Sequence, residues 1–229
     1  LIRSNIFVLL LLALATLAAH GWSLGDGLFL DDHWHLTKYR DNDWSFHSLM
    51  DAGTIEPERF IQSWWQEQPV RWTYARPFAI FVTKLAYHIS GGSVVALHAL
   101  NLALHWIGAV LVHHLCLRLT RRRFWSAVGG LLFIVYSHSL FSVSWIAAQN
   151  TVLQTVLMLG AVLCYVRASS LNLCPDDTLG NDQSSGCNIP PTDAGVPPLR
   201  LGAFVGVLSL WIGSLLSREN ALVLLVYLP

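Results

Sequence analysis

Residues 94–117 read VVALHALNLALHWIGAVLVHHLCL, and this run is long and apolar enough to cross a lipid bilayer as a helix. Hydrophobic residues make up 54% of the chain and charged residues only 12%, whereas a soluble domain carries about 25% charge. Because the apolar residues are clustered in long runs, we expect an integral membrane protein. The formal net charge is zero and no long basic block is present, so nothing indicates nucleic acid as a partner.

Further apolar runs on both sides predict an all-α, polytopic transmembrane helix bundle that forms a single domain over residues 1–229. The predicted spans are 5–21, 94–117, 124–140, 151–166 and 201–216, followed by the start of a sixth at 221–228. A long outer loop, 22–76, follows the first helix, and a polar loop occupies 168–199. Since the chain begins without Met and ends directly after an apolar stretch, we expect it to be incomplete at one or both ends, with the C-terminus as the favoured one.

A further helix, predicted over 78–89, is too short to span the bilayer, which requires roughly 20 residues. Pro77 precedes it, and proline is favoured in the first turn of a helix. We therefore expect an interfacial helix that lies at the membrane surface on the side of the outer loop.

The basic residues near the spans predict the orientation of the chain. Arg3 and the arginines of 118–123 favour the cytoplasmic side, so we expect a cytoplasmic N-terminus. The outer loop with Asp31 and the end of the fifth span with Arg218 then lie outside. This outer side would be the periplasm of a bacterial inner membrane or the lumen of the ER.

The position of the polar loop 168–199 stays open. It contains Cys174 and Cys187. Counting the predicted spans from the cytoplasmic N-terminus puts this loop in the cytoplasm. If the helix at 78–89 spans the membrane, the parity of all later segments reverses. A disulfide between the two cysteines would favour that reversed arrangement, because disulfides form in oxidising compartments.

Three polar residues of the second span, His98, Asn101 and His105, share one helical face at i, i+3 and i+7. Polar groups in membrane helices usually face other helices and hydrogen-bond there. Two histidines could also bind a metal, but no Glu or Cys lies at matching spacing. We favour a structural polar stripe over a metal site.

Asp31 and Asp32 follow the first apolar run, where a carboxylate pair near lipid needs an explanation. A solvated surface pair and a catalytic base at the membrane surface are both open interpretations. A divalent metal held by the aspartates and histidines of the outer loop is a less favoured one.

Arg76 and Arg218 each lie at a predicted membrane surface, and Glu219 follows Arg218. Either arginine could extend its charge to the lipid headgroups, and Arg218 could pair with Glu219. Either could also bind a phosphate, because guanidinium donors match phosphate oxygens. We leave these alternatives open.

Several short motifs occur in a fixed order along the chain: LFLDD at 28–32, YARPF at 74–78, LHALNLALH at 97–105, VSWIA at 143–147 and LSRENA at 216–221. This series resembles the polytopic glycosyltransferases of the GT-C fold. It is most similar to the protein O-mannosyltransferase-like branch, which includes relatives with C-terminal tetratricopeptide repeats. The similarity covers about 28–228, apart from the loop 168–199.

The resemblance implies a membrane glycosyltransferase that moves a mannose-like sugar from a polyprenyl-phosphate carrier to a hydroxyl of a protein or glycan acceptor, with inversion. It implies Asp31 as the base, with Asp32 as the second candidate. It also implies that Arg76 and Arg218, with Glu219 beside it, bind the lipid phosphate. It implies no definite cofactor beyond the lipid-linked donor, and a divalent metal stays the less favoured alternative.

The chain also departs from this family: Ala75 replaces the usual aromatic before Arg76, and Arg218 stands where Lys is common. Residues 137–141, Ser-His-Ser-Leu-Phe, lack the Pro and Glu usual there, and Ala148-Gln149 stands where Gly-Arg is usual. The alternative is therefore a non-catalytic subunit of GT-C origin with a structural role beside other subunits in a larger membrane complex.

Overall fold

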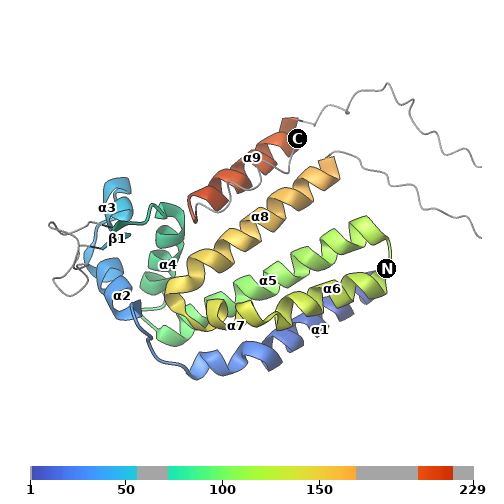
Figure 1. Cartoon of the computed structure of the whole chain (residues 1–229), viewed down its shortest axis with the longest axis horizontal. Coiled ribbons are helices and arrows are strands. Elements are labelled where there is room, and N and C mark those ends of the chain that lie inside the picture. The colour runs from blue at the N-terminus through green and yellow to red at the C-terminus, as the bar shows by residue number, and fades with distance from the viewer. Residues whose placement is uncertain (1, 56–71, 169–200, 219–229) are drawn as a thin grey trace, which may run out of the picture.

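The computed structural model describes residues 2–55, 72–168 and 201–218. Helices dominate this part of the chain (Figure 1). In chain order, the elements are α1 (Ile2–His20), the 3-10 helix η1 (Gly21–Gly25), α2 (Asp32–Asp41), α3 (Phe46–Asp51), β1 (Thr54–Ile55), β2 (Trp72–Thr73), α4 (Pro77–Ile89), α5 (Val94–Thr120), α6 (Arg123–Val135), α7 (Ser137–Ser144), the 3-10 helix η2 (Ile146–Ala148), α8 (Gln149–Ala168) and α9 (Leu201–Leu215). The predicted all-helical class is confirmed for these residues, with one antiparallel pair of two-residue strands as the exception.

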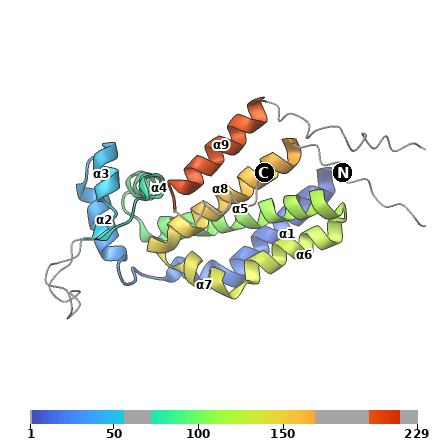
Figure 2. The same ribbon diagram turned by 45° about the horizontal axis from the view of Figure 1, so that its top comes forward.

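Five helices, α1, α5, α6, α8 and α9, run along the long axis of the molecule and alternate in direction (Figures 1 and 2). α5 contacts α1, α6 and α8, and α9 packs on α8. The elements α2, α3, β1, β2 and α4 gather at one end of this bundle, which we call the polar end. α4 is seen almost end-on in Figure 2, so it crosses the end of the bundle instead of running along it.

Within the described residues, three helical segments are long and apolar enough to cross a membrane: Ile6–Gly25, Val94–Thr120 and Ile146–Arg167. α6 and the described part of α9 are apolar but shorter. The outer face of α1 exposes Phe7, Leu10 and Leu14. A soluble protein would cover so many large apolar side chains, so they indicate a surface that faces lipid.

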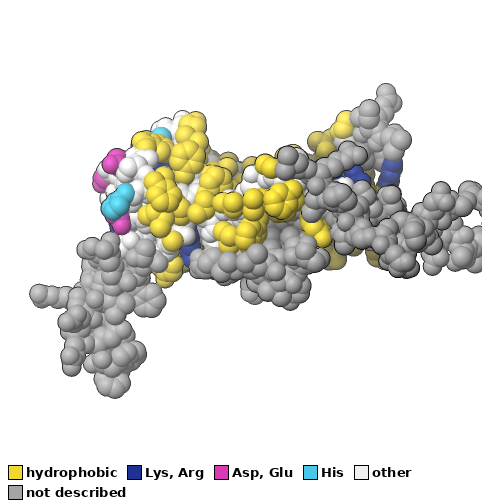
Figure 3. All heavy atoms as spheres, turned by 90° about the horizontal axis from the view of Figure 1, so that it is seen from above, with side chains coloured by type: hydrophobic (Ala, Val, Ile, Leu, Met, Phe, Trp, Pro, Cys, Tyr) yellow, Lys and Arg dark blue, Asp and Glu magenta, His cyan; other side chains and the backbone are white. Residues whose placement is uncertain are grey.

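Charged side chains mark the two ends of the molecule. Acidic and histidine side chains are visible at the polar end in Figure 3, and hydrophobic side chains extend along the bundle. The turn between α5 and α6 carries exposed Arg121 and Arg122 at the opposite end. α1 begins at that opposite end as well.

Glycine allows α6 to approach α1 and α5 closely. A Cβ atom on Gly130 would lie 3.0 Å from Leu12 Cδ2 and 3.2 Å from the carbonyl oxygen of Ala109. Leu12, Ala109 and Ile134 form a fully buried cluster at this contact. Close backbone approach through small residues is how membrane helices gain packing energy without a hydrophobic driving force.

The segment predicted as one span over 124–140 is divided in the structure. α6 ends at Val135, Tyr136 adopts an extended backbone with ψ 126°, and α7 begins at Ser137. Serine competes poorly for helix interiors and favours helix starts, which accounts for a break where the apolar run gives way to Ser-His-Ser. The break turns the chain toward η2 at the polar end.

The predicted outer loop 22–76 is partly helical, because its described part contains α2 and α3. Leu36, Tyr39 and Leu49 are buried in one cluster with Ile80 of α4 and Leu97 of α5. The polar end therefore has a core of its own that joins it to the bundle.

Some predictions lie outside the described residues. These are the loop 168–199 beyond Ala168, with Cys174 and Cys187, as well as Glu219 and the start of a sixth span at 221–228. The side chain of Arg3 also lies outside them.

Candidate functional site

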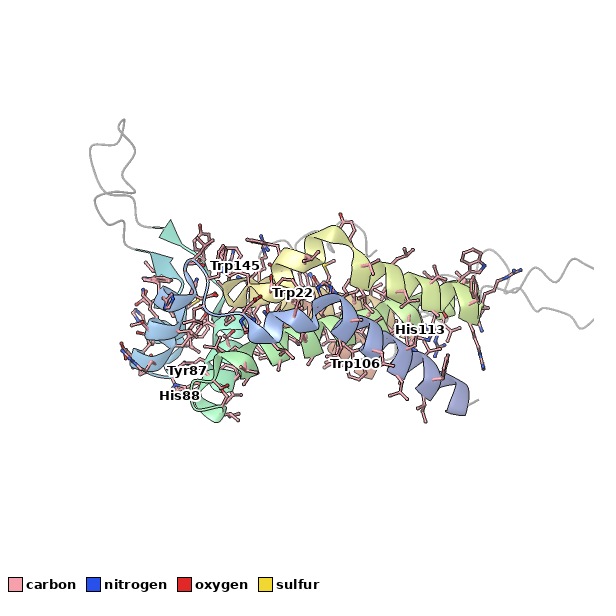
Figure 4. All side chains as sticks on the ribbon, turned by 90° about the horizontal axis from the view of Figure 1, so that it is seen from below. Trp22, Tyr87, His88, Trp106, His113 and Trp145 are labelled. Carbon is pink, nitrogen blue, oxygen red and sulfur yellow. The ribbon has the colours of Figure 1, made fainter. Side chains whose placement is uncertain are left out.

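A cavity of about 380 Å³ lies where the polar end meets the bundle. Its lining comes from α2, α4, η2 and the start of α8, and from residues next to helices and strands, such as Asp31 before α2 and Arg218 after α9. The charged and polar side chains that matter below are Asp31, His35, Arg76, Gln149, Thr151 and Arg218. Trp145, also in the lining, is labelled in Figure 4 at this end, far from His113 near the other end. Residues from both halves of the chain thus meet at one place.

Asp32 connects the polar end to the bundle. Its side chain is fully buried, and its two carboxylate oxygens accept hydrogen bonds from the backbone N–H groups of Phe29 (2.9 Å) and Ala147 (2.8 Å). Ala147 lies in the first turn of the helical segment that begins with η2, whose amides have no partner within the helix. Asp32 therefore caps this helix from 115 positions away. Burial raises the pKa of this carboxyl, against the effect of the two amide donors.

Asp31 lies beside Asp32 but has different surroundings. Its side chain is 43% exposed, lines the cavity, and lies 3.5 Å from Nε2 of His35, one turn along α2. The hydrogen bond with His35 is the main reason why the pKa of Asp31 is lowered, and burial opposes it. Asp31 is therefore the carboxylate that a ligand in the cavity can reach, and it is ionised at neutral pH.

One backbone hydrogen bond brings the two arginines to the same cavity. The N–H of Phe78 in the first turn of α4 donates to the carbonyl oxygen of Leu216 just after α9, at 3.1 Å. Arg76 precedes the first residue by two positions, and Arg218 follows the second by two. Arg76 also lies over the ring of Tyr74, with 4.8 Å between its Cζ atom and the ring centroid.

Arg218 is held by the start of α8. Its Nη1 donates to the hydroxyl oxygen of Thr151, which also lines the cavity. The predicted partner Glu219 lies outside the described residues. Guanidinium groups at this position supply positive charge where a phosphate group could bind.

Several residues that line the cavity have a buried polar atom without a hydrogen-bond partner in the described part of the chain. Nδ1 of His35, Nε2 of Gln149 and Nε of Arg218 are buried and have no hydrogen-bond partner among the described residues. Most buried polar atoms in proteins are paired, so each exception needs an explanation. A polar ligand in the cavity would supply the missing partners.

The polar stripe of α5 lies behind the cavity and is buried at all three positions. Nδ2 of Asn101 donates to the carbonyl oxygens of Val143 (3.2 Å) and Trp145 (3.3 Å), which fixes the turn between α7 and η2. His105 stacks on Phe133, with 5.0 Å between ring centroids. Neither ring nitrogen of His98 has a partner within the described chain, so the predicted interhelical hydrogen bond is not found there.

The structure therefore brings Asp31, Arg76 and Arg218 together and separates Asp32 from them. Sequence reasoning noted Gln149 only as a departure from the family pattern, and it missed Thr151 as a residue of the site. Within the described residues, no group of three His, Cys, Asp or Glu side chains is arranged to hold a metal ion.

Comparison of the chain with protein-family models, with curated proteins and with solved structures gives no match. The function is therefore inferred from the cavity and from the motifs quoted above.

Proposed function

We propose that this chain is a membrane glycosyltransferase that transfers a mannose-like sugar from a polyprenyl-phosphate carrier to a hydroxyl of a protein or glycan acceptor. The observation that carries this proposal is the cavity itself, which is lined by an accessible carboxylate, Asp31, and by two guanidinium groups, Arg76 and Arg218. The GT-C resemblance of the motifs around these three residues supports the same chemistry.

The proposed reaction is a single displacement. The acceptor hydroxyl attacks the anomeric carbon, and Asp31 takes the hydroxyl proton as the new C–O bond forms. The bond between the anomeric carbon and the phosphate oxygen breaks at the same time, and the lipid phosphate leaves with the electron pair. Arg76 and Arg218 stabilise the charge that develops on this phosphate. Attack opposite the leaving group inverts the anomeric configuration.

In this proposal Asp31 is the base, and Asp32 holds the site together. Both oxygens of Asp32 already accept backbone hydrogen bonds, so no ligand is needed to satisfy them. The proposal has the polar end outside, in the periplasm or ER lumen, and the N-terminus in the cytoplasm. The exposed arginines between α5 and α6, at the opposite end, support this orientation.

Transfer assays with the purified protein test this function. The donor is a polyprenyl-phosphate mannose and the acceptor is a serine-containing and threonine-containing peptide. We expect Asp31→Asn to lower the transfer rate by about 10²-fold or more, the usual contribution of a positioned base. Asp41→Asn is the matched control, because Asp41 is an exposed aspartate at the end of α2 that pairs with Arg40. Unchanged transfer in Asp31→Asn would rule out this assignment of the base.

The second candidate function is a non-catalytic subunit that keeps this fold and contributes to a larger membrane complex. The cavity wall favours it at one position, because the neutral Gln149 lies there, where the family that the chain resembles has an arginine. Wild-type protein that binds polyprenyl phosphate but transfers no sugar to any acceptor, and that purifies with stoichiometric partners, would favour this candidate.

A further inference from the structure

Gln149 is the least explained side chain of the cavity. It opens α8, lines the cavity wall and is only 1% exposed. A neutral amide contributes nothing to the charge that binds a phosphate, and no step of the proposed displacement uses it. Its burial still costs free energy unless its polar atoms are paired.

One end of the Gln149 amide is fixed by Thr83 of α4. The hydroxyl oxygen of Thr83 lies within hydrogen-bond distance of Oε1 of Gln149 and of the carbonyl oxygen of Ala79, the latter at 2.9 Å. A threonine hydroxyl has a single proton, so it donates to one of these two oxygens and not to both.

Both possible arrangements leave one amide atom of Gln149 without a partner. If Thr83 donates to Oε1, the NH₂ group is unpaired, in agreement with Nε2 having no partner among the described residues. If Thr83 donates to Ala79, the amide is turned over, its NH₂ donates to Thr83, and the oxygen is the unpaired atom. The two orientations of an amide are distinguished by hydrogen bonding and not by shape.

A hydroxyl group satisfies either arrangement, because it both donates and accepts hydrogen bonds. Phosphate oxygens would satisfy only the first. Among the components of a lipid-linked sugar, the hydroxyls belong to the sugar. A site that hydrogen-bonds a hydroxyl also discriminates strongly against ligands that lack one, since its own polar group is then left unpaired.

We propose that Gln149, held by Thr83, determines specificity by hydrogen-bonding a hydroxyl of the sugar on the lipid carrier. This inference rests on the proposed function and adds the part of the donor that the arginines do not recognise. Arg76 and Arg218 bind the phosphate of any polyprenyl phosphate, whereas Gln149 distinguishes the sugar-bearing lipid from the sugar-free one.

The test compares the affinities of the purified full chain for two probes, a polyprenyl-phosphate mannose and the same polyprenyl phosphate without sugar. We expect wild type to bind the mannose-bearing lipid at least 10-fold more tightly. Gln149→Leu, which keeps the size and removes the amide, should reduce this preference about 10-fold and leave the Kd for the sugar-free lipid within about 2-fold. Thr83→Val removes the hydroxyl anchor and should reduce the preference in the same direction.

Gln154→Leu is the matched control. Gln154 is a buried glutamine on the same helix that does not line the cavity, so its replacement should leave the preference unchanged. Because Gln149→Leu and Thr83→Val change different helices, a folding defect in one of them leaves the other as the test.

The outcomes separate the two proposals. If wild type binds both lipids equally, or if Gln149→Leu and Thr83→Val keep the full preference, the role of Gln149 is wrong and the glycosyltransferase proposal stands. If wild type binds neither lipid, the proposed function falls and the role of Gln149 falls with it. Loss of the preference in both variants, with unchanged binding of the sugar-free lipid, supports the inference.

Discussion

The two ends of the molecule are built differently. At the polar end, hydrogen bonds join residues far apart in the chain, such as Asp32 with Ala147 and Phe78 with Leu216. At the opposite end, the turn between α5 and α6 is held by local contacts, such as the Arg121 N–H to the carbonyl oxygen of Leu117. A small number of long-range hydrogen bonds therefore shapes the cavity, whereas the hydrogen bonds named at the opposite end join residues close in the chain. We therefore expect single substitutions to destabilise the polar end much more than the opposite end.

The largest effect is expected for Asp32→Ala. This change leaves the backbone N–H groups of Phe29 and Ala147 without acceptors in a buried place, and each unpaired donor costs about 1–3 kcal/mol. We expect the free energy of unfolding in detergent to fall by about 3 kcal/mol, together with loss of transfer. Asp41→Ala, which removes an exposed carboxylate, should leave the free energy of unfolding close to that of wild type, because exposed ion pairs contribute little. Equal stability of the two variants would contradict the capping role of Asp32.

A smaller loss of stability is expected for Gly53→Ala. Gly53 lines the cavity, its carbonyl oxygen accepts the N–H of Tyr74 at 3.0 Å, and an added Cβ would lie 2.1 Å from the Tyr74 carbonyl oxygen. Because that atom belongs to the backbone, the chain near β2 has to move, at a cost of about 2 kcal/mol. Hydrogen exchange of the Tyr74 amide should become faster.

Gly27→Ala is the control for this change, because a Cβ atom there meets nothing within 4 Å. It should leave the exchange of the Tyr74 amide as it is in wild type. Slow exchange in both variants would show that the close approach of Gly53 to Tyr74 does not hold the polar end together.

Lys84→Met should have a moderate and local effect. The Lys84 side chain is 1% exposed, and its Nζ donates to the backbone carbonyl oxygens of Asn42 and Asp43 (2.8 Å to the latter). Met keeps the volume but leaves both carbonyls without this donor, so we expect a loss of about 1 kcal/mol. This loss should be measurable as faster limited proteolysis between α2 and α3. Arg122→Met, at an exposed position of the opposite end, should leave proteolysis there unchanged.

The helical bundle was predictable from the sequence, but the different surroundings of Asp31 and Asp32 at the cavity were not. Apolar runs predict helices directly, because their length and composition must match the bilayer. Asp31 and Asp32 are adjacent and chemically identical, so no pattern distinguishes them. What separates them is the N–H of Ala147, 115 positions away from Asp32, which only the folded chain brings near.

The surroundings of Gln149 and the helices within the outer loop could not be predicted from the sequence for the same reason. Gln149 matters because its amide has one fixed end and one free end, and this depends on Thr83 from another helix. α2 is rich in charged residues and histidine, so its buried side, with Leu36 and Tyr39, is a weak signal in the sequence. Local pattern predicts the elements, but pairing between distant elements decides which side chains a ligand can reach.

The smallest effect is expected for His35→Ala. His35 is the main cause of the lowered pKa of Asp31, so its removal should raise that pKa toward the ordinary value of a carboxyl. In wild type, the carboxylate stays ionised to a lower pH than usual, and its contribution is lost only as the pH falls through this lowered pKa. The acidic limb of the pH profile of transfer should therefore move to higher pH in His35→Ala, with little change at neutral pH. His33→Ala is the control, because His33 is exposed on the same helix and does not line the cavity. An acidic limb that stays in place in His35→Ala would mean that the pair one turn apart on α2 does not tune the base.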